Sequence, residues 1–269
     1  MPSYAIIGAS RGMGLEFVKI LSKTNDNTVF AVVRNPDSAT KLQHFASSQP
    51  NVRIVKGDLD SVDSLKAAAS DIASVTSGKL DVLILNGALM GSQYSGLTLD
   101  KFPDPQTLEA DLTAGFRSNA VGSAHAINAF LPLLRAGAKK TILAMSTAAA
   151  DVDFVRTVDF PSNTTYTVSK AAMNMVVTQF AVALRPEGFT VLSVSPGYVN
   201  TFTEDPNDFA SIPQLIQSLA ATFKKAAPDW DGKPLTPAGA VSNVLEVLSS
   251  VGPEQSGSYL SHHGNKEWV

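Results

Sequence analysis

Tyr166 and Lys170 are the two side chains of this sequence whose types and spacing most clearly permit chemistry. They lie four residues apart in Tyr166-Thr-Val-Ser-Lys170, which opens a stretch rich in Ala and Met. On a helix this spacing puts the phenol and the ammonium on the same face. A free phenol has a pKa of about 10, and an adjacent cation favours its ionised form. The pair could therefore act in acid–base catalysis, although the spacing alone is a common coincidence.

A second motif is the glycine-rich turn Gly8-Ala-Ser-Arg-Gly-Met-Gly14, which follows the first apolar run and precedes a helical pattern. Glycine lets the backbone approach a pyrophosphate closely, and the free N–H groups of a helix start favour an anion. The spacing of Gly8, Gly12 and Gly14 differs from the usual G-x-G-x-x-G fingerprint of dinucleotide sites. We interpret the turn as a pyrophosphate site, and the alternative is an ordinary strand-to-helix turn.

Arg34 directly follows the second apolar run, at residues 28–33. In dinucleotide-binding folds, the residue at this point is acidic when it binds the ribose of NAD and basic when it matches the 2′-phosphate of NADP. Asp37, beyond Pro36, is predicted to be a helix N-cap instead. Arg11 could place a second guanidinium on the same phosphate. The pattern favours NADP(H) over NAD(H), with two solvated surface arginines as the alternative.

The elements that must position these residues follow from short apolar runs rich in β-branched residues. The runs occupy residues 4–7, 28–33, 52–55, 80–85, 141–145, 190–194 and 257–260, and helical patterns lie between most of them. Alternating strands and helices require right-handed crossovers and a sheet covered on both faces. We therefore predict an α/β fold, a single Rossmann-type domain over residues 1–269 with a doubly wound, mainly parallel seven-stranded sheet.

Two late segments interrupt this alternation. Residues 151–165 are polar and irregular, and residues 202–237 carry several prolines around an amphipathic stretch of Leu215, Ile216 and Leu219. Insertions beyond strand ends are where a doubly wound sheet places its substrate-contacting segments. We predict a substrate loop at 151–165 and a lid at 202–237.

The composition limits the partners of such a fold. The chain has 44% hydrophobic and 17% charged residues, a net charge of −3 and no cysteine. This balance fits a large core, provides no basic field for a nucleic acid, and excludes disulfides and Cys-based metal sites. The start of the sequence lacks a secretory signal pattern, and no apolar run approaches the roughly 20 residues that span a bilayer. We expect a soluble, cytoplasmic protein without a nucleic-acid or membrane partner.

Three histidines and two methionines could suggest a metal or ligand site, but we assign none of them to one. His125 lies on an apolar helical face, so we predict a packed core residue rather than a metal ligand or base, and we predict no metal site. Met173 and Met175 are predicted to lie in the core or in a subunit interface. His262 and His263 are adjacent near the end of the chain.

Taken in order, the motifs resemble those of the short-chain dehydrogenase/reductase family. They are Gly8-x-x-x-Gly12-x-Gly14, Asn86-Gly-Ala, Asn119, Ser146-Thr147, Tyr166-x-x-x-Lys170 and Pro196-Gly197. The resemblance covers essentially the entire chain. Its nearest form is similar to the NADPH-dependent carbonyl reductases and ketoreductases that end in a Gly-rich strand and a late Trp, here Trp268.

The resemblance implies roles for five residues. Tyr166 would donate a proton to a carbonyl oxygen, and Lys170 would lower the pKa of Tyr166 and hold the nicotinamide ribose. Thr147 would orient the carbonyl, with Ser146 as the alternative, because the Ser-Ser pair of the family reads Ser146-Thr147 here. Asn119 would hold the water of a proton relay, or it would only disturb its helix locally. A long separation between Thr147 and Tyr166 implies an enlarged loop at 151–165.

The resemblance also implies a cofactor site. Asp58 and Leu59 would contact adenine, although Asp58 could equally cap a helix. The Val199 backbone would meet the carboxamide and Thr201 a phosphate, and Asn86-Gly-Ala transposes the Asn-Ala-Gly of the family. The cofactor-binding residues are predicted to be Gly8, Ser10, Arg11, Gly12, Met13, Gly14, Arg34, Asp58, Leu59, Asn86, Gly87, Ala88, Tyr166, Lys170, Pro196, Gly197, Val199 and Thr201.

The expected function is an NADP(H)-dependent oxidoreductase that moves a hydride between nicotinamide and a ketone, an aldehyde or a secondary alcohol. Phe154, Phe160, Phe202 and Phe209 favour a bulky apolar or aromatic substrate, and the resemblance implies a homodimer or homotetramer. One alternative is a non-catalytic sensor of NADP(H), which has no need to retain Tyr166, Lys170 and Asn119 together. Another is a non-redox enzyme of the same fold, an epimerase or dehydratase.

Overall fold

Seven strands form one sheet, as predicted. The structure, a computed structural model, describes residues 1–203 and 214–269, and at residues 214–217 it describes the backbone alone. Every strand pairing is parallel, in the order β3-β2-β1-β4-β5-β6-β7. The strands are β1 (Ser3–Ile7), β2 (Thr28–Val33), β3 (Val52–Lys56), β4 (Val82–Leu85), β5 (Thr141–Met145), β6 (Thr190–Ser195) and β7 (Tyr259–Ser261). The direction of winding reverses between β1 and β4, and ligands of such sheets bind beyond the carboxyl ends of the strands at this point.

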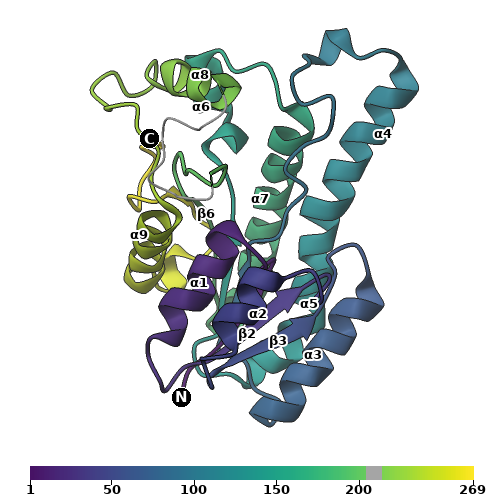
Figure 1. Ribbon diagram of the computed structural model, residues 1–269, viewed down its shortest axis with the longest axis vertical. Coiled ribbons are helices and arrows are strands. Elements are labelled where there is room, and N and C mark those ends of the chain that lie inside the picture. Colours follow the sequence, from purple (N-terminus) through teal and green to yellow (C-terminus); the bar gives the residue numbers. More distant parts are fainter. Residues whose placement is uncertain (204–213) are drawn as a thin grey trace.

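Helices cover both faces of the sheet (Figure 1). On one face, the core is built by α3 (Val62–Thr76), α5 (Gly122–Ala136) and α7 (Thr164–Leu184). On the other it is built by α1 (Gly12–Ser22), α2 (Thr40–Ala46) and α9 (Pro237–Ser250). Neighbouring strand residues alternate between the two cores, which is why the strands are continuously apolar: Ile6 belongs to one core and Ile7 to the other.

The junction between α4 (Pro105–Gly115) and α5 is a π-helical turn, Phe116–Val121. Asn119 lies in this turn, so the helix is widened at the position of a predicted functional side chain. Turns of this kind occur often at functional sites.

Residues 151–165 are more regular than the sequence indicated. They contain α6 (Val152–Val158), capped by the Asp151 carboxylate, which accepts from Phe154 N at 2.9 Å. The apolar side of α6 consists of Phe154 and Val158, which pack with Trp268 from the end of the chain. The helix was missed because its seven residues are too few to show a helical period, and the packing partner of its two buried side chains is remote in sequence.

The predicted lid at 202–237 includes α8 (Gln214–Phe223), which lies near α6 in Figure 1. Phe209 and the side chains of Leu215 and Ile216 fall outside the described residues. Leu219 is half-buried and Phe202 is exposed. In the described part of the chain, no helix combines the length and hydropathy needed to cross a membrane.

Asp37 does not cap a helix, contrary to the prediction. The helix α2 begins at Thr40 after Ala39, without a side-chain cap. Residues 36–39 form a turn first, in which Ala39 N donates to Pro36 O at 3.1 Å, and this turn separates Asp37 from the helix start.

Candidate active site

The predicted site residues gather at the carboxyl edge of the sheet, after β1, β4, β5 and β6. Asn86 follows β4, and its Nδ2 donates to Gly8 O after β1 at 2.9 Å. Ser146 follows β5, and its N donates to Val194 O in β6 at 2.7 Å. Parallel pairing brings these strand ends to one edge, and α7 carries Tyr166 and Lys170 to it.

Tyr166 and Lys170 are both buried, at 9% and 1% relative exposure. The Lys170 ammonium donates to Met145 O, the carbonyl at the end of β5, at 2.7 Å. Its Nζ lies 5.9 Å from the centre of the Tyr166 ring. The predicted pair is therefore on one helix face, with the ammonium hydrogen-bonded to the backbone.

The pKa of Tyr166 is shifted in the direction opposite to the prediction. Burial raises the pKa of Tyr166 above its ordinary value, and burial lowers the pKa of Lys170 to about 7. Desolvation opposes charge on both groups and outweighs their attraction across this separation. The phenol therefore keeps its proton at neutral pH, which suits a proton donor.

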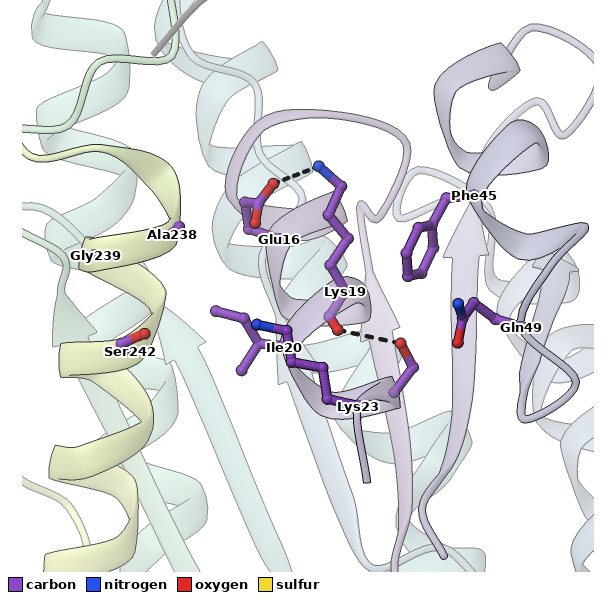
Figure 2. A pocket seen from close by; sticks show the side chains of 10 residues that line it. Glu16, Lys19, Ile20, Lys23, Phe45, Gln49, Ala238, Gly239 and Ser242 are labelled. Carbon is purple, nitrogen blue, oxygen red and sulfur yellow. Dashed lines mark hydrogen bonds and ion pairs between the residues drawn. The ribbon is translucent and has the colours of Figure 1, made fainter. Parts of the chain in front are cut away.

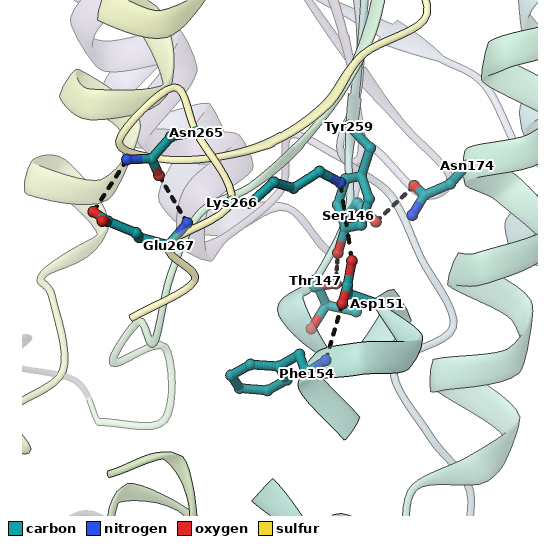
Figure 3. Close-up of polar contacts among 9 residues, drawn as sticks. All are labelled: Ser146, Thr147, Asp151, Phe154, Asn174, Tyr259, Asn265, Lys266 and Glu267. Carbon is teal, nitrogen blue, oxygen red and sulfur yellow. Dashed lines mark hydrogen bonds and ion pairs between the residues drawn. The ribbon is translucent and has the colours of Figure 1, made fainter. Parts of the chain in front are cut away.

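Ser146 and Thr147 differ in what their hydroxyls do. Ser146 is 3% exposed, and its Oγ donates to Asn174 Oδ1 at 2.8 Å (Figure 3). Thr147 is half-buried; its Oγ1 accepts a long bond of 3.3 Å from Ala149 N and donates to no described residue. The Thr147 hydroxyl is thus the one whose proton is available to a ligand.

Asn174 and Tyr259 complete this region, and the sequence analysis missed both. Asn174 lies on α7 one turn beyond Lys170, so the Tyr166–Lys170 face continues to the residue that holds Ser146. The Tyr259 hydroxyl, from β7, donates to the Thr147 carbonyl (Figure 3). The four-residue spacing could have revealed Asn174, whereas no local signal marks Tyr259.

The side chain of Asn119 is fully buried and bonded on both sides. Its Oδ1 accepts from Leu89 N at 2.7 Å, and its Nδ2 donates to Leu89 O at 2.9 Å and to Ser169 Oγ at 2.8 Å. The amide therefore ties the π-helical turn to the segment after β4 and to the residue before Lys170. Its bonds reach distant segments, so it does more than disturb its own helix.

Two of the three glycines in the turn, Gly8 and Gly14, have no room for a Cβ. Gly8 and Gly12 have φ values of 86° and 54°, in the left-handed region. A Cβ on Gly8 would clash with the Gly87 backbone, and one on Gly14 would clash with the carbonyl of Gly8. Thr201 lies beside Gly12, with its Cγ2 3.7 Å from the point a Cβ would occupy. The close backbone approach at the start of α1 fits a pyrophosphate.

Arg11 lies within this turn, and Arg34 follows the neighbouring strand β2. Arg11 and Arg34 are exposed, and within residues 1–203 and 214–269 neither forms an ion pair or a side-chain hydrogen bond. Ser10 and Met13 are half-buried in the turn, and Met13 packs on the core beneath it. Both guanidiniums are therefore available to pair with an anionic group.

Asp58 does not cap α3; Ser61 does, by accepting from Ser64 N at 3.2 Å. The Asp58 carboxylate accepts from Asp60 N at 3.1 Å instead. Leu59 is buried and packs against Gly87, whose Cβ would lie 3.1 Å from Leu59 Cδ1. The contact of Asp58 and Leu59 with adenine stays a prediction, while the helix-cap alternative for Asp58 is wrong.

The segment after β6 is held in place from two sides. Gly197 has a φ of 82°, and a Cβ there would lie 2.7 Å from Cε1 of His262, so the imidazole packs on the turn. Val199 forms an isolated bridge with Leu235. His262 is buried, Nδ1 has no partner in the described part of the chain, and burial together with His263 lowers the pKa of His262 to about 4.

Aromatic rings from residues 151–165 and the chain after β6 form a cluster. Phe154 and Phe160 contact Phe223 at centroid distances of 5.5 and 6.1 Å. Tyr198 contacts the same Phe223 ring at 5.9 Å and Trp230 at 5.7 Å. Of the four predicted phenylalanines, Phe154 and Phe160 join this cluster, Phe202 is exposed, and Phe209 is among residues 204–213, which are not described.

The remaining predictions concern a histidine on α5 and two methionines on α7. His125 on α5 is half-buried rather than fully packed in the core. Met173 is core, and Met175 is exposed. Among the described residues, no three His, Asp or Glu side chains are grouped as metal ligands.

A hollow of about 550 Å³ lies outside this region, between α1, α9 and the end of α2 (Figure 2). Its lining includes Lys19, Phe45 and Ser242, and none of the predicted catalytic or cofactor-binding residues. A smaller one of about 170 Å³, lined by Tyr198, His262 and others, lies beside the segment after β6.

Comparisons with known proteins agree with this geometry. The family described as short chain dehydrogenase matches residues 4–208. Two fungal relatives align with the full chain and over their own full length: the short-chain dehydrogenase/reductase atnB of Arthrinium sp., 34% identical over 275 residues, and the short chain dehydrogenase virK of Hypocrea virens, 34% identical over 278 residues.

Solved structures are similar as well. An NADPH-bound carbonyl reductase from chicken fatty liver has a TM-score of 0.77 and 26% identity, with 98% of each chain covered. The carbonyl reductase Sniffer of D. melanogaster has a TM-score of 0.77 at 22% identity, again with 98% of each chain covered, which supports the fold alone. With the parallel sheet, the glycine turn and the Tyr166–Lys170 face in place, the chain belongs to the short-chain dehydrogenase/reductase family, and it is an oxidoreductase of that kind.

Proposed function

We propose that this protein is an NADP(H)-dependent carbonyl reductase that converts a bulky apolar or aromatic ketone or aldehyde to an alcohol. The observation that carries the proposal is the juxtaposition at the carboxyl edge of the sheet: the buried Tyr166–Lys170 face and the Thr147 hydroxyl meet the end of β5, where Lys170 donates to Met145 O at 2.7 Å. A protonated phenol and a hydroxyl donor are the two groups that a carbonyl oxygen requires.

The residues of the glycine turn would hold the cofactor. The backbone from Gly8 to Gly14 receives the pyrophosphate at the start of α1, and Thr201 beside Gly12 adds a hydroxyl. When bound, a reduced nicotinamide dinucleotide supplies the hydride that reduces the carbonyl carbon. The Val199 backbone, fixed by its bridge to Leu235, holds the carboxamide end.

The preference for NADP(H) rests on Arg11 and Arg34. Both guanidiniums are exposed and have no partner among the described residues, so they are available for a 2′-phosphate at the end of β2. The carbonyl reductase from chicken fatty liver was solved with NADPH bound. This relative at 26% identity supports the same preference here.

The catalytic residues act on the substrate oxygen. Thr147 donates a hydrogen bond that orients the carbonyl, and Tyr166 transfers its phenolic proton to the oxygen as negative charge develops there. The product is the alcohol, and Tyr166 is left as a phenolate beside Lys170. A protonated Lys170 stabilises this anion, since opposite charges in a buried site attract strongly.

Tyr166 must then recover its proton. We assign this step to a relay from Lys170 to solvent through a water held at the π-helical turn of Asn119. The Asn119 amide supports this assignment because it fixes Ser169, the neighbour of Lys170, at 2.8 Å. Substitution of Asn119 by Ala would slow turnover at high substrate concentration.

The substrate class rests on the aromatic cluster of Phe154, Phe160, Tyr198, Phe223 and Trp230. Apolar surface favours a ligand that itself loses apolar surface to water on binding. Aromatic ketones should therefore have higher kcat/KM than small hydrophilic aldehydes.

The test is the oxidation of NADPH, followed by absorbance against a panel of aromatic ketones, aliphatic ketones and small aldehydes. Turnover of an aromatic ketone to its alcohol, identified by chromatography, supports the proposal. Binding of NADPH without turnover of any carbonyl would favour the sensor, and a product formed without net NADPH oxidation would favour the epimerase or dehydratase.

We also propose a homodimer or homotetramer. Val168, Met175 and Val182 recur at seven-residue intervals along α7 and are 50%, 60% and 53% exposed, so they form an apolar stripe. Sedimentation of the parent and of Met175→Glu measures the role of this stripe: the charged variant should shift toward monomer. A location in the cytoplasm stays a prediction.

A further inference from the structure

Tyr259 brings a second tyrosine hydroxyl to the active site. It lies on β7, the last strand, and its hydroxyl donates to the backbone carbonyl of Thr147, 112 residues earlier in the chain (Figure 3). Tyr259 has no role among the motifs that define the site. Its partner, however, is the residue whose side-chain hydroxyl is proposed to orient the substrate.

The Tyr259 hydroxyl belongs to a cluster of polar side chains around the turn after β5. Ser146 Oγ donates to Asn174 Oδ1 at 2.8 Å, and both side chains also interact with the Tyr259 phenol. Burial and the nearby Asp151 and Tyr166 raise the pKa of Tyr259 above its ordinary value, against the effect of these hydrogen bonds. Tyr259 is therefore a neutral hydrogen-bond donor throughout the physiological pH range.

The Tyr259 ring is fixed independently of its hydroxyl. It packs on Trp268 with a centroid distance of 4.5 Å and an interplanar angle of 31°. The Lys266 ammonium lies 4.5 Å from the Tyr259 ring centre and 3.9 Å from Asp151 Oδ2, at the start of α6 (Figure 3). The ring thus belongs to the C-terminal segment that covers α6, and its position does not depend on the bond to Thr147.

The Thr147 carbonyl accepts a second hydrogen bond, from Ala150 N at 2.9 Å. This local bond closes the turn at residues 147–150, so the turn can form without the Tyr259 hydroxyl. What the hydroxyl adds is a restraint from the last strand, β7, on the peptide unit that carries the Thr147 side chain. Catalytic donors lose much of their effect when they are displaced by about 1 Å.

We propose that Tyr259 is a positioning residue, whose hydroxyl fixes the peptide of Thr147 so that the Thr147 hydroxyl points at the substrate carbonyl. This proposal rests on the proposed function, because it concerns the same reaction. Tyr259 acts through Thr147 and does not itself contact the reacting atoms.

The test combines Tyr259→Phe, Thr147→Val and the double variant. Phenylalanine keeps the ring that packs on Trp268 and removes only the hydroxyl. The rate of NADPH oxidation by an aromatic ketone is measured in a single turnover, together with the Kd for NADPH from fluorescence and the melting temperature. Tyr4→Phe is the matched control, since Tyr4 is a buried tyrosine on β1 whose hydroxyl interacts only weakly, at 3.4 Å, with Lys139.

We expect Tyr259→Phe to lower the single-turnover rate about tenfold, the value of one ordinary hydrogen bond, with NADPH affinity within about twofold of the parent. In the Thr147→Val background the same change should lower the rate less than about twofold, because no hydroxyl is left to position. Tyr4→Phe should leave the rate unchanged.

The outcomes separate the two proposals. If the parent reduces carbonyls and the effects of Tyr259→Phe and Thr147→Val on the rate multiply, the positioning role is overturned and the reductase stands. The same conclusion follows if Tyr259→Phe only lowers the melting temperature and leaves the rate unchanged. A parent that turns over no carbonyl overturns the reductase, and the positioning role with it.

Discussion

Lys170 donates a hydrogen bond to the carbonyl of Met145, 2.7 Å away, and a longer one of 3.5 Å to Met173 Sδ, rather than to the phenol of Tyr166 one turn earlier on α7. The ammonium is thereby fixed at the end of β5, beside the turn that carries Thr147. Burial raises the pKa of Tyr166, so the phenol stays protonated at neutral pH. In the proposed mechanism the two side chains have separate roles: Tyr166 donates the proton, and Lys170 carries the charge that stabilises the resulting phenolate.

Substitution of Tyr166 by Phe should abolish reduction while cofactor binding persists. Removal of a general acid costs about 10²- to 10⁴-fold in rate, and phenylalanine fills the same buried space. The measurements are kcat for an aromatic ketone and the Kd for NADPH from fluorescence. A variant that retained more than about a tenth of the parent kcat would remove Tyr166 from the mechanism.

Substitution of Arg34 by Ala should raise the KM for NADPH by about 10- to 100-fold, because a hydrogen bond to a charged group contributes about 1.5–3 kcal/mol. The KM for NADH should stay within about twofold, since NADH lacks the 2′-phosphate. Arg185→Ala is the control, because Arg185 is an exposed arginine in the turn after α7. An equal rise in KM for NADPH and NADH would mean that Arg34 does not bind the 2′-phosphate.

Substitution of Thr147 by Val should cost much more activity than substitution of Ser146 by Ala. Valine is nearly isosteric with threonine and lacks the hydroxyl, and the loss of such a donor costs about 10²- to 10³-fold in kcat. The variant Thr147→Ser should recover most of the rate. In Ser146→Ala, the effect should be smaller, since its hydroxyl is bonded to Asn174; the reverse order of kcat values would make Ser146 the catalytic hydroxyl.

Substitution of Lys170 by Met should stabilise the protein at low pH. The pKa of Lys170 is about 7 in the folded protein and about 10.4 in an unfolded chain, so between these values the unfolded state binds the additional proton. The stability of the parent therefore rises with pH from about 7 to 10, and the cost of the buried ammonium is greatest below pH 7.

Melting temperatures at several pH values test this linkage. At pH 6 we expect Lys170→Met to melt roughly 3 °C or more above the parent, which corresponds to about 1 kcal/mol in a chain of this size. The difference should shrink toward pH 10. Lys66→Met, at an exposed position on α3, should show no such pH dependence, and a difference in the Lys170 variant that grew with pH would contradict the buried-ammonium explanation.

Local patterns in the sequence were sufficient to predict the parallel sheet, the glycine turn and the Tyr166–Lys170 face. The strands were predicted because residues such as Ile6 and Ile7 contribute to the cores on opposite faces of the sheet, which makes each strand a continuous apolar run. The glycine turn was predicted because left-handed backbone at Gly8 and Gly12 needs residues without a Cβ. Each of these features depends on residues that are close together in the sequence.

Tertiary structure decided what depends on partners remote in sequence. Our proposal of Thr147 rather than Ser146 rests on the bond of Ser146 to Asn174, and Tyr259 reaches Thr147 from the last strand. The spacing of Tyr166 and Lys170 predicted attraction between them, but a pKa depends on burial by the whole fold, and burial reversed its direction for Tyr166. Sequence alone thus determined which groups are present and which face they share. Packing determined which partners they bond to and in which direction their pKa values shift, because both depend on residues that are remote in the chain.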